Sequence, residues 1–372
     1  MRIGVPKEIK DNEYRVGLVP ETVHDLTKRG HEVFVETQAG SGAGISDDEY
    51  AQAGAAISAS GVRVFEQAEL IVKVKEPLAS ERERLRRGQV LFTYLHLAPD
   101  RDQTKSLVAS GVTAIAYETV TDDHGGLPLL KPMSEVAGRM AAQVGAQYLE
   151  RPNGGRGILL GGVEGVEPAT VFIVGAGVVG GNAALIALGM KADVTLTATR
   201  PASLQAIKDR LGQNVRTVLS NEQTIAEHCR RADLVIATAL VPGAMAPKLI
   251  SKSMVKSMKQ GAVIVDVSID QGGNAETSRP TTHSQPTFVV DGVVHYCVAN
   301  MPGAVPRTST FALNRATRPF VLALANKGYR RALLEDPHLR NGLNVSDGKI
   351  TCRAVANALE LPYTSAEDVL RD

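Results

Sequence analysis

One glycine-rich stretch constrains the fold more than any other part of the chain. Residues 170–174 form a short apolar, β-branched run, which is typical of a strand buried on both faces. Gly175, Gly177 and Gly180 follow in the G-x-G-x-x-G spacing, and residues 182–188 predict a helix of small side chains. A strand, a tight glycine turn and a helix start together indicate a dinucleotide-binding unit.

Each glycine of this motif has its own physical task in such a unit. Gly175 allows a sharp turn, Gly177 lets a pyrophosphate approach the backbone, and Gly180 allows the helix to pack closely on the strand. The helix N-terminus adds free N–H groups and the positive end of the helix dipole. A glycine-rich turn without a ligand is the alternative interpretation, but the flanking strand and helix favour dinucleotide binding.

The acidic residue that normally follows in an NAD-binding unit is missing. It is expected at the end of the second strand, where it holds the ribose 2′-hydroxyl. That strand is predicted at residues 193–199, and it has Asp193 at its start but Ala198 at the expected acid position, with Arg200 just beyond. Without the carboxylate a 2′-phosphate is not repelled, and an arginine can pair with it. We therefore expect use of NADP, alone or beside NAD, unless Arg200 is only a solvated loop charge.

Length and composition exclude several other classes of protein. The chain has 372 residues, enough for two domains, and a net charge of +1, so nothing points to a nucleic acid or an anionic membrane as partner. No apolar run is long enough to span a bilayer, and the first residues lack the apolar region of a signal peptide. Three widely spaced cysteines argue against a disulfide framework. We expect a cytoplasmic protein.

Strands and helices alternate along the first third of the chain, which predicts a parallel α/β sheet. A helix is expected at residues 20–30, with a proline at its start and a glycine as its stop, and shorter helices at 46–50 and 81–87. The predicted strands of this part are residues 1–6, 31–36, 69–75, 90–96 and 113–120.

The rest of the chain predicts a second lobe inserted between the two ends of the first. Ser134 is expected to cap a long helix running to about residue 149, and a second long helix at 307–327 leads back to the first lobe. We therefore expect an α/β fold with two Rossmann-like lobes and parallel sheets, joined by these two helices. The predicted domains are a substrate domain (1–130 and 306–372) and a dinucleotide domain (131–305), with a ligand cleft between them.

Four polar residues are candidates for chemistry on a substrate. Arg15 lies in a polar loop after the first strand, Lys75 and His96 end predicted strands, and Asp270 follows another strand. Side chains at the carboxyl ends of parallel strands point to where ligands bind. Two cations can hold a carboxylate and polarise a carbonyl, and a histidine can carry a proton near neutral pH. Taken singly, each residue could equally be structural, as we expect for Lys73.

Several segments along nearly the whole chain, in order, resemble the alanine dehydrogenase family. Its broader family includes the NAD-binding part of proton-translocating transhydrogenase and lysine-forming saccharopine dehydrogenase. The segments that carry the resemblance are residues 1–9, 13–15, 73–77, 94–98, 175–180, 233–236, 241–243, 266–273, 278–282 and 298–302.

The resemblance implies a function and a role for each candidate. Arg15 and Lys75 match residues that hold the substrate carboxylate and keto oxygen, His96 matches the proton donor and acceptor, and Asp270 matches a residue that assists the addition of water or ammonia. The implied reaction is the reversible oxidative deamination of L-alanine to pyruvate and ammonia with a nicotinamide cofactor. The resemblance also implies a homo-oligomer, a hexamer.

The resemblance further implies dinucleotide contacts beyond the three glycines. The matching positions are Ser134, Val178, Val179, Ser220, Ala239, Leu240, Val267, Ser268, Ile269, Asp270, Arg279, Val298, Ala299, Asn300 and Met301. Two departures from the family pattern matter. The acid that family members have is replaced by Ala198, and a Glu and a His that look like metal ligands in some relatives fall on Ala323 and Lys327, so we expect no metal.

Three alternatives remain open from the sequence. One is another amino-acid dehydrogenase of the same family that acts on a different 2-oxo acid. A second is a dinucleotide-binding subunit that passes hydride to a partner, as in transhydrogenase, although the sequence ends at Asp372 without a membrane segment. A third is a nucleotide-sensing module without turnover. The set of Arg15, Lys75, His96 and Asp270 favours independent chemistry on ammonia.

Overall fold

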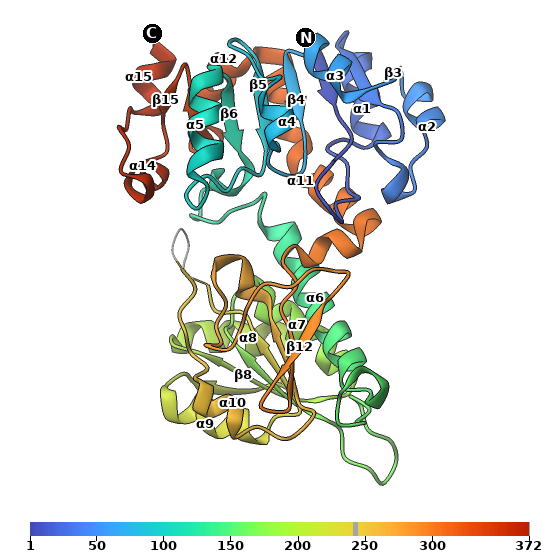
Figure 1. Cartoon of the computed structure of the whole chain (residues 1–372), viewed down its shortest axis with the longest axis vertical. Coiled ribbons are helices and arrows are strands. Elements are labelled where there is room, and N and C mark those ends of the chain that lie inside the picture. Colours follow the sequence, from blue (N-terminus) through green and yellow to red (C-terminus); the bar gives the residue numbers. More distant parts are fainter. Residues whose placement is uncertain (241–244, 372) are drawn as a thin grey trace. The chain divides into compact units, whose positions relative to one another are not determined.

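The computed structural model describes residues 1–240 and 245–371, which form two compact units (Figure 1). The first unit combines both ends of the chain, Met1–Met133 and Gly303–Asp372, and the second is the continuous stretch Ser134–Pro302. Each unit is built on one largely parallel β-sheet with helices around it. The predicted α/β fold with two such sheets is therefore confirmed.

The sheet of the first unit has eight strands in the order β15-β14-β6-β5-β4-β1-β2-β3. The six strands from β6 to β3 are parallel, and β14 and β15 are antiparallel at one edge. Their bounds are β1 (Arg2–Val5), β2 (Glu32–Glu36), β3 (Ala56–Ser58), β4 (Leu70–Val72), β5 (Val90–Thr93), β6 (Thr113–Ala116), β14 (Leu343–Ser346) and β15 (Lys349–Ile350). The parallel strands thus follow the 3-2-1-4-5-6 order, with its topological switch point between β1 and β4.

The helices of the first unit pack their apolar faces against this sheet. One buried cluster joins α3, α5 and α14 to the strands through side chains such as Phe65, Leu107 and Val355. The predicted acidic helix start at residue 46 is confirmed, because Ser46 and Glu49 form a capping box. The helices are α1 (Pro20–Lys28), α2 (Asp47–Gln52), α3 (Gly61–Gln67), α4 (Ala79–Arg82), α5 (Arg101–Ser110), α11 (Pro306–Lys327), α12 (Tyr329–Glu335), α13 (Pro337–Arg340), α14 (Arg353–Leu359) and α15 (Ala366–Arg371), with 3-10 turns η1 (Ser41–Ala43) and η2 (Tyr117–Thr119).

Three predicted strands of this unit, β4, β5 and β6, end several residues earlier than expected, and β6 is followed directly after Ala116 by η2. β4 ends at Val72 and β5 at Thr93, so Lys75 and His96 lie in the following loops and do not end strands. Beyond Val72 the backbone also forms hydrogen bonds with side chains. The N–H of Lys73 still donates to the Phe92 carbonyl of β5 at 3.2 Å, but the Lys73 carbonyl accepts the Tyr117 hydroxyl at 2.9 Å. Our prediction also omitted β3, α3 and α5.

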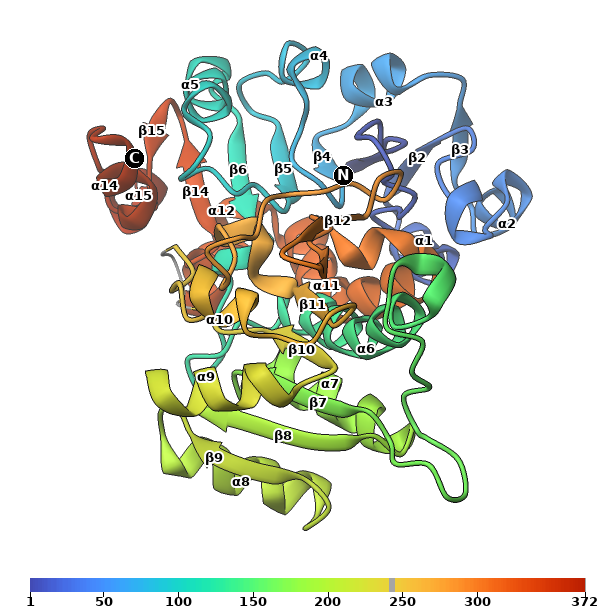
Figure 2. The ribbon, with the colours of Figure 1, turned by 60° about the horizontal axis from the view of Figure 1, so that its bottom comes forward.

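The sheet of the second unit has seven strands in the order β12-β13-β11-β10-β7-β8-β9. All neighbours are parallel except the hairpin pair β12 and β13, and Figure 2 shows β7, β8 and β9 next to one another. The bounds are β7 (Thr170–Val174), β8 (Asp193–Ala198), β9 (Arg216–Leu219), β10 (Leu234–Ala237), β11 (Val263–Asp266), β12 (Thr287–Val290) and β13 (Val293–Tyr296). The six parallel strands again follow the 3-2-1-4-5-6 order, with the switch point between β7 and β10.

The helices around the second sheet agree with most of the expectations. The helix expected at residues 182–188 is part of α7, whereas α6 begins at Lys131, so Ser134 lies inside this helix and does not cap it. The earlier start is possible because Pro132 fits the first turn of a helix. The bounds are α6 (Lys131–Tyr148), α7 (Val178–Gly189), α8 (Pro201–Leu211), α9 (Glu222–Arg231) and α10 (Lys252–Lys256), with 3-10 turns η3 (Arg151–Asn153), η4 (Val267–Gln271) and η5 (Met301–Ala304). None of the described helices is long and apolar enough to cross a membrane.

Candidate active site

The three fingerprint glycines have distinct surroundings at the carboxyl end of β7. Gly175 has a φ of +117°, which side chains rarely adopt, and a Cβ there would lie 2.7 Å from the Thr238 hydroxyl. A Cβ on Gly180 would lie 1.9 Å from the Gly175 carbonyl oxygen, so only glycine allows the helix this close to the strand. At Gly177 no described atom apart from its chain neighbours would lie within 4 Å. The open side of the turn is therefore at Gly177.

The start of α7 suits an anionic group. Gly177 is the N-cap of this helix and offers no side chain to its first N–H groups. Val178, the first residue of α7, is 39% exposed, and Val179 is half-buried. Unpaired N–H groups and the helix dipole bind anions such as phosphate. Together with the space beside Gly177, this edge fits the pyrophosphate of a dinucleotide.

The residues expected from the sequence to select between dinucleotides lie at the ends of β8 and β9. Ala198 is the last residue of β8 and is half-buried, and its carbonyl accepts the N–H of Ser220 at 2.9 Å. Arg200 is exposed and forms the N-cap of α8. These three predicted residues therefore lie at one end of neighbouring strands, beside the fingerprint strand β7.

The loops after β10 and β11 are held together by a residue that our sequence reasoning missed. The side chain of Asn274 accepts the N–H of Ala239 at 2.9 Å and donates to the Ala239 carbonyl at 2.9 Å. That carbonyl also accepts the Ser268 hydroxyl at 3.0 Å. The buried Asp266 carboxylate holds the Asn274 N–H at 2.8 Å. Asn274 belongs to no recognised motif, and only these long-range bonds reveal it.

Most of the remaining predicted residues of the second unit follow strands of the same sheet. Asp270 is exposed within η4, directly after β11. Arg279 places its guanidinium 4.3 Å from the centre of the Phe288 ring. The others follow β10, β11 or β13, or lie on α6: Leu240, Val267, Ile269, Val298, Ala299, Asn300, Met301 and Ser134. Residues 241–243, which contribute to the resemblance, lie outside the described residues.

In the first unit, Arg15 lies beside the switch point and is almost fully buried. Its guanidinium donates to both carboxylate oxygens of Glu13, from Nε at 2.6 Å and from Nη2 at 2.5 Å, and Nη1 lies 3.1 Å from the sulfur of Met133. Burial by itself lowers the pKa of Arg15, but the hydrogen bond and charge of Glu13 outweigh it and raise the pKa. The guanidinium is therefore a fixed positive charge.

Lys75 lies on the other side of the switch point, in the loop after β4. Lys73, two residues earlier, forms buried ion pairs. The Lys73 ammonium is fully buried and lies 3.1 Å from the Glu8 carboxylate and 2.7 Å from that of Glu81. The other oxygen of Glu8 accepts the N–H groups of Val74 at 2.7 Å and Lys75 at 3.4 Å. Lys73 is thus used inside the protein, as expected, while Lys75 is only half-buried.

His96 follows β5, one strand further along the sheet. Its imidazole is exposed and stacks on the ring of the buried Tyr94, with ring centres 5.8 Å apart and planes 7° apart. Its backbone has a φ of +49°, and its N–H donates to the Glu118 carboxylate at 2.6 Å. Burial raises the pKa of Tyr94, so its hydroxyl stays protonated and donates to the Leu129 carbonyl at 2.6 Å.

Three of the four candidates for chemistry therefore meet at one edge of one sheet. Arg15, Lys75 and His96 follow the neighbouring parallel strands β1, β4 and β5, whereas Asp270 belongs to the second unit. Glu8 and Glu118, which bond to the loops of Lys75 and His96, were not singled out from the sequence. Their partners are distant along the chain, and no local pattern indicates such pairings.

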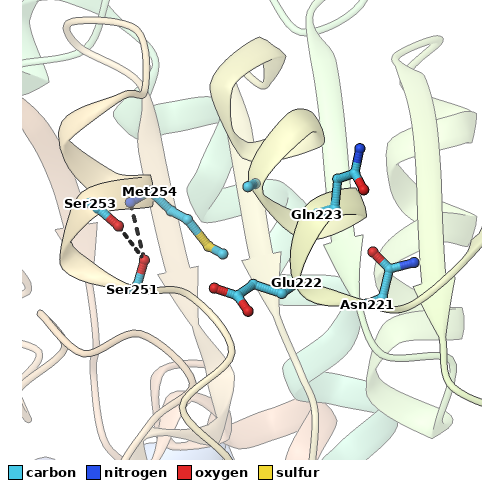
Figure 3. A pocket seen from close by; sticks show the side chains of 7 residues that line it. Asn221, Glu222, Gln223, Ser251, Ser253 and Met254 are labelled. Atoms are coloured by element: carbon cyan, nitrogen blue, oxygen red, sulfur yellow. Dashed lines mark hydrogen bonds between the residues drawn. The ribbon is translucent and has the colours of Figure 1, made fainter.

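A separate hollow of about 490 Å³ lies between α9 and α10 in the second unit (Figure 3). Asn221, Glu222 and Ser251 contribute to its wall, and Ser251 accepts the Met254 N–H at 3.3 Å. Among the described residues that line it, none is a predicted site residue and only Glu222 is ionisable. The hollow therefore lacks a set of groups for catalysis. Nowhere in the described chain do three or more His, Cys, Asp or Glu side chains gather in a group that could hold a metal ion.

Comparisons with known proteins agree with this arrangement. The family model "Alanine dehydrogenase/PNT, N-terminal domain" matches residues 4–137, and the model of the C-terminal domain matches residues 141–353. An alanine dehydrogenase of Halomonas elongata is 56% identical over 370 residues, and one of Methanococcus maripaludis is 55% identical over 373 residues, each covering 100% of both chains.

Solved structures agree as well. An L-alanine dehydrogenase has a TM-score of 0.94 at 50% identity and covers 97% of this chain and 99% of its own. A transhydrogenase from Sinorhizobium meliloti has a TM-score of 0.81 at 26% identity, over 95% of this chain and 100% of its own. The resemblance seen in the sequence is confirmed, and the chain belongs to the alanine dehydrogenase/PNT family.

Proposed function

We propose that this protein is an alanine dehydrogenase, which converts L-alanine reversibly to pyruvate and ammonia with a nicotinamide cofactor. The identity above 50% over the full length of relatives with that name carries the proposal. The positions of Arg15, Lys75 and His96 at one sheet edge support it. The first unit would be the substrate domain and the second the dinucleotide domain.

The second unit would hold the cofactor along the carboxyl edge of its sheet. Gly177 and the start of α7 would receive the pyrophosphate, because no described side chain fills that space. The ends of β8 and β9 would receive the adenosine part. When bound, the nicotinamide ring supplies the acceptor for the hydride of the substrate Cα.

The first unit would hold the substrate by charge. A guanidinium has five N–H donors, so Arg15 can pair with Glu13 and with a substrate carboxylate at once. Lys75 would steady the oxygen or nitrogen at the reacting carbon, since an ammonium stabilises developing negative charge there. Both cations favour a small oxo acid over a neutral ligand.

Proton transfers would fall to His96, with Asp270 assisting. An exposed imidazole can take a proton from water as water adds to the imine carbon and return it when ammonia leaves. Asp270 would orient the water or amine. We expect His96→Ala and Asp270→Asn each to abolish turnover while the cofactor still binds, and near-normal kcat in either variant would refute its assigned role.

The choice of cofactor is part of this proposal. Ala198 leaves no carboxylate at the end of β8, and the exposed Arg200 follows it, so we propose that NADP is accepted, alone or beside NAD. By resemblance we also propose a homohexamer in the cytoplasm, which sedimentation velocity would check for the assembly.

Steady-state kinetics of pyruvate and ammonia with NADH and with NADPH test the proposal directly. Turnover with pyruvate, much faster than with larger 2-oxo acids, is expected. A strong preference for NADH would refute the cofactor choice, and a better rate with another oxo acid would favour a different amino-acid dehydrogenase. Hydride transfer between two dinucleotides without use of pyruvate would favour a transhydrogenase subunit, which the similarity to the Sinorhizobium meliloti structure keeps as second candidate.

A further inference from the structure

We propose that Glu8 and Glu118 are positioning residues that hold the loops of Lys75 and His96 in place. The inference rests on the proposed function and concerns two carboxylates that the proposed reaction does not use. Each accepts N–H groups from two consecutive residues in the loop after a parallel strand, and each pair includes a residue of the proposed site.

The contacts of Glu118 explain the unusual backbone of His96. One carboxylate oxygen lies 2.6 Å from the His96 nitrogen and 3.2 Å from that of Leu95, and the other oxygen also lies 3.2 Å from the Leu95 nitrogen. His96 has a φ of +49°, an uncommon conformation for a residue with a Cβ. Hydrogen bonds to a charged acceptor are stronger than neutral ones, so Glu118 can hold this conformation.

Other side chains also hold the backbone of this loop. The Gln103 side chain donates to the Leu95 carbonyl at 2.5 Å, and the Thr104 hydroxyl donates to the Leu97 carbonyl at 3.1 Å. Tyr94 is buried below the exposed ring of His96 and stacks on it. The backbone is thus fixed from both sides while the ring reaches solvent, which is what a proton-transferring group needs.

Glu8 accepts hydrogen bonds from the Lys75 loop in the same way, and its carboxylate is itself bound by the Lys73 ammonium. One oxygen of Glu8 accepts the Val74 and Lys75 N–H groups, and the other lies 3.1 Å from the buried Lys73 ammonium. Lys73 also pairs with Glu81. A buried ion pair is often no more stabilising than apolar residues of similar size. Stability therefore gives little reason for this network, whereas orientation of Lys75 does.

Loss of the Glu8 contacts and loss of the Glu118 contacts should have different kinetic consequences. A shift of Lys75 weakens the hold on the oxo acid and raises its KM, whereas a shift of His96 slows proton transfer and lowers kcat. A displacement of about 1 Å can cost on the order of 100-fold in rate. A merely structural role would lower the melting temperature of both variants without this split.

The test compares Glu8→Gln and Glu118→Gln with Asp336→Asn as matched control. Asp336 also accepts two backbone N–H groups with one oxygen, those of His338 at 2.8 Å and Leu339 at 3.0 Å, but it caps the start of α13, which carries no proposed site residue. In each variant the amide keeps the size and one acceptor oxygen and removes the charge. We would measure kcat and KM for pyruvate with saturating ammonia and cofactor, cofactor binding, and the melting temperature.

We expect Glu118→Gln to lower kcat on the order of 10- to 100-fold with little change in KM. Glu8→Gln should raise KM by a similar factor with a smaller change in kcat, and Asp336→Asn should change neither. If Glu8→Gln does not fold, Thr93→Val replaces it, because the Thr93 hydroxyl donates to the Lys75 carbonyl at 2.9 Å and its loss should raise KM to a smaller extent.

Two results would overturn the inference. If the variants keep the wild-type kcat and KM and differ from the wild type only in melting temperature, the two glutamates are structural. In that case the proposed function still stands, provided that the wild type turns over pyruvate and His96→Ala does not. Absence of turnover in the wild type would overturn the proposed function and this inference together.

Discussion

Replacing Gly177 and Gly180 separately by alanine should separate cofactor binding from stability. Both residues belong to the same turn, but a Cβ on Gly180 would lie 1.9 Å from the Gly175 carbonyl oxygen and 3.0 Å from the Thr238 hydroxyl. A Cβ on Gly177 would point into space free of described atoms. Gly189, the last residue of α7, is equally open and lies at the other end of the helix, so Gly189→Ala is a matched control.

The magnitudes follow from these surroundings. No real Cβ tolerates the contact at Gly180, so the helix must shift, and such overpacking costs about 1–3 kcal/mol or more. For a domain of roughly 150–250 residues each kcal/mol lowers the melting temperature by about 2–4 °C. Gly177 has a φ of −76°, which alanine adopts readily, so Gly177→Ala should change stability by less than about 1 kcal/mol.

The effect on the cofactor should be the reverse. The methyl group in Gly177→Ala would occupy space that the pyrophosphate needs, and we expect the Kd for NADH or NADPH to rise on the order of 10- to 100-fold, or about 1.4–2.8 kcal/mol. Gly189→Ala should leave the Kd unchanged and raise stability by roughly 0.5–1 kcal/mol through helix propensity.

Fluorescence titration with reduced cofactor and thermal unfolding without cofactor measure the two effects on the same samples. If Gly177→Ala binds the cofactor as tightly as Gly189→Ala, the pyrophosphate does not approach the turn at Gly177. The proposed site would then be wrong even if the enzyme is active. A Gly180→Ala protein that melts with the wild type would instead contradict the packing argument.

Four further outcomes are expected. His96→Ala should retain its affinity for the cofactor in a fluorescence titration but lose at least about 100-fold in kcat, since general acid–base catalysis contributes roughly 10²–10⁴-fold. Ala198→Asp should shift the ratio of kcat/KM for NADH and NADPH towards NADH, because it restores a 2′-hydroxyl acceptor and repels a 2′-phosphate; an unchanged ratio would refute the role of this position. Burial raises the pKa of the Cys229 and Cys297 thiols to about 12, so iodoacetamide at pH 8 should modify the half-buried Cys352 first in the native protein, as mass spectrometry would show. The neutral thiols favour the folded state, so their contribution is complete below the ordinary thiol pKa of about 8.5 and is lost as the pH rises towards about 12, which unfolding curves at pH 8 and pH 10 would detect.

The agreement between sequence and fold is best where local signals coincide. The strand, glycine turn and helix around Gly175 could be predicted because strand propensity, glycine spacing and a run of small helix-forming residues all lie within residues 170–188. The bounds of α8 follow from a proline at its start and a glycine at its end. Such signals are local in the chain, so they need no knowledge of its tertiary neighbours.

The ends of β4 and β5 could not be predicted, because partners distant in sequence decide them. The apolar run through Val74 continues the strand pattern, but its N–H bonds to Glu8, which lies 66 positions away in the chain. The N–H of His96 bonds to Glu118, 22 positions away. Hydrophobic periodicity carries no information on such pairings.

The sequence by itself thus determined that the chain has a dinucleotide fingerprint, an alternating α/β pattern and a set of cationic and imidazole groups with family-specific neighbours. Only the tertiary structure decided the strand order, the switch points, and the carboxylates that hold the Lys75 and His96 loops. The physical reason is the distance along the chain over which each kind of interaction acts. Propensity and spacing act over a few residues, whereas sheet order and buried hydrogen bonds depend on which segments meet when the chain closes long loops.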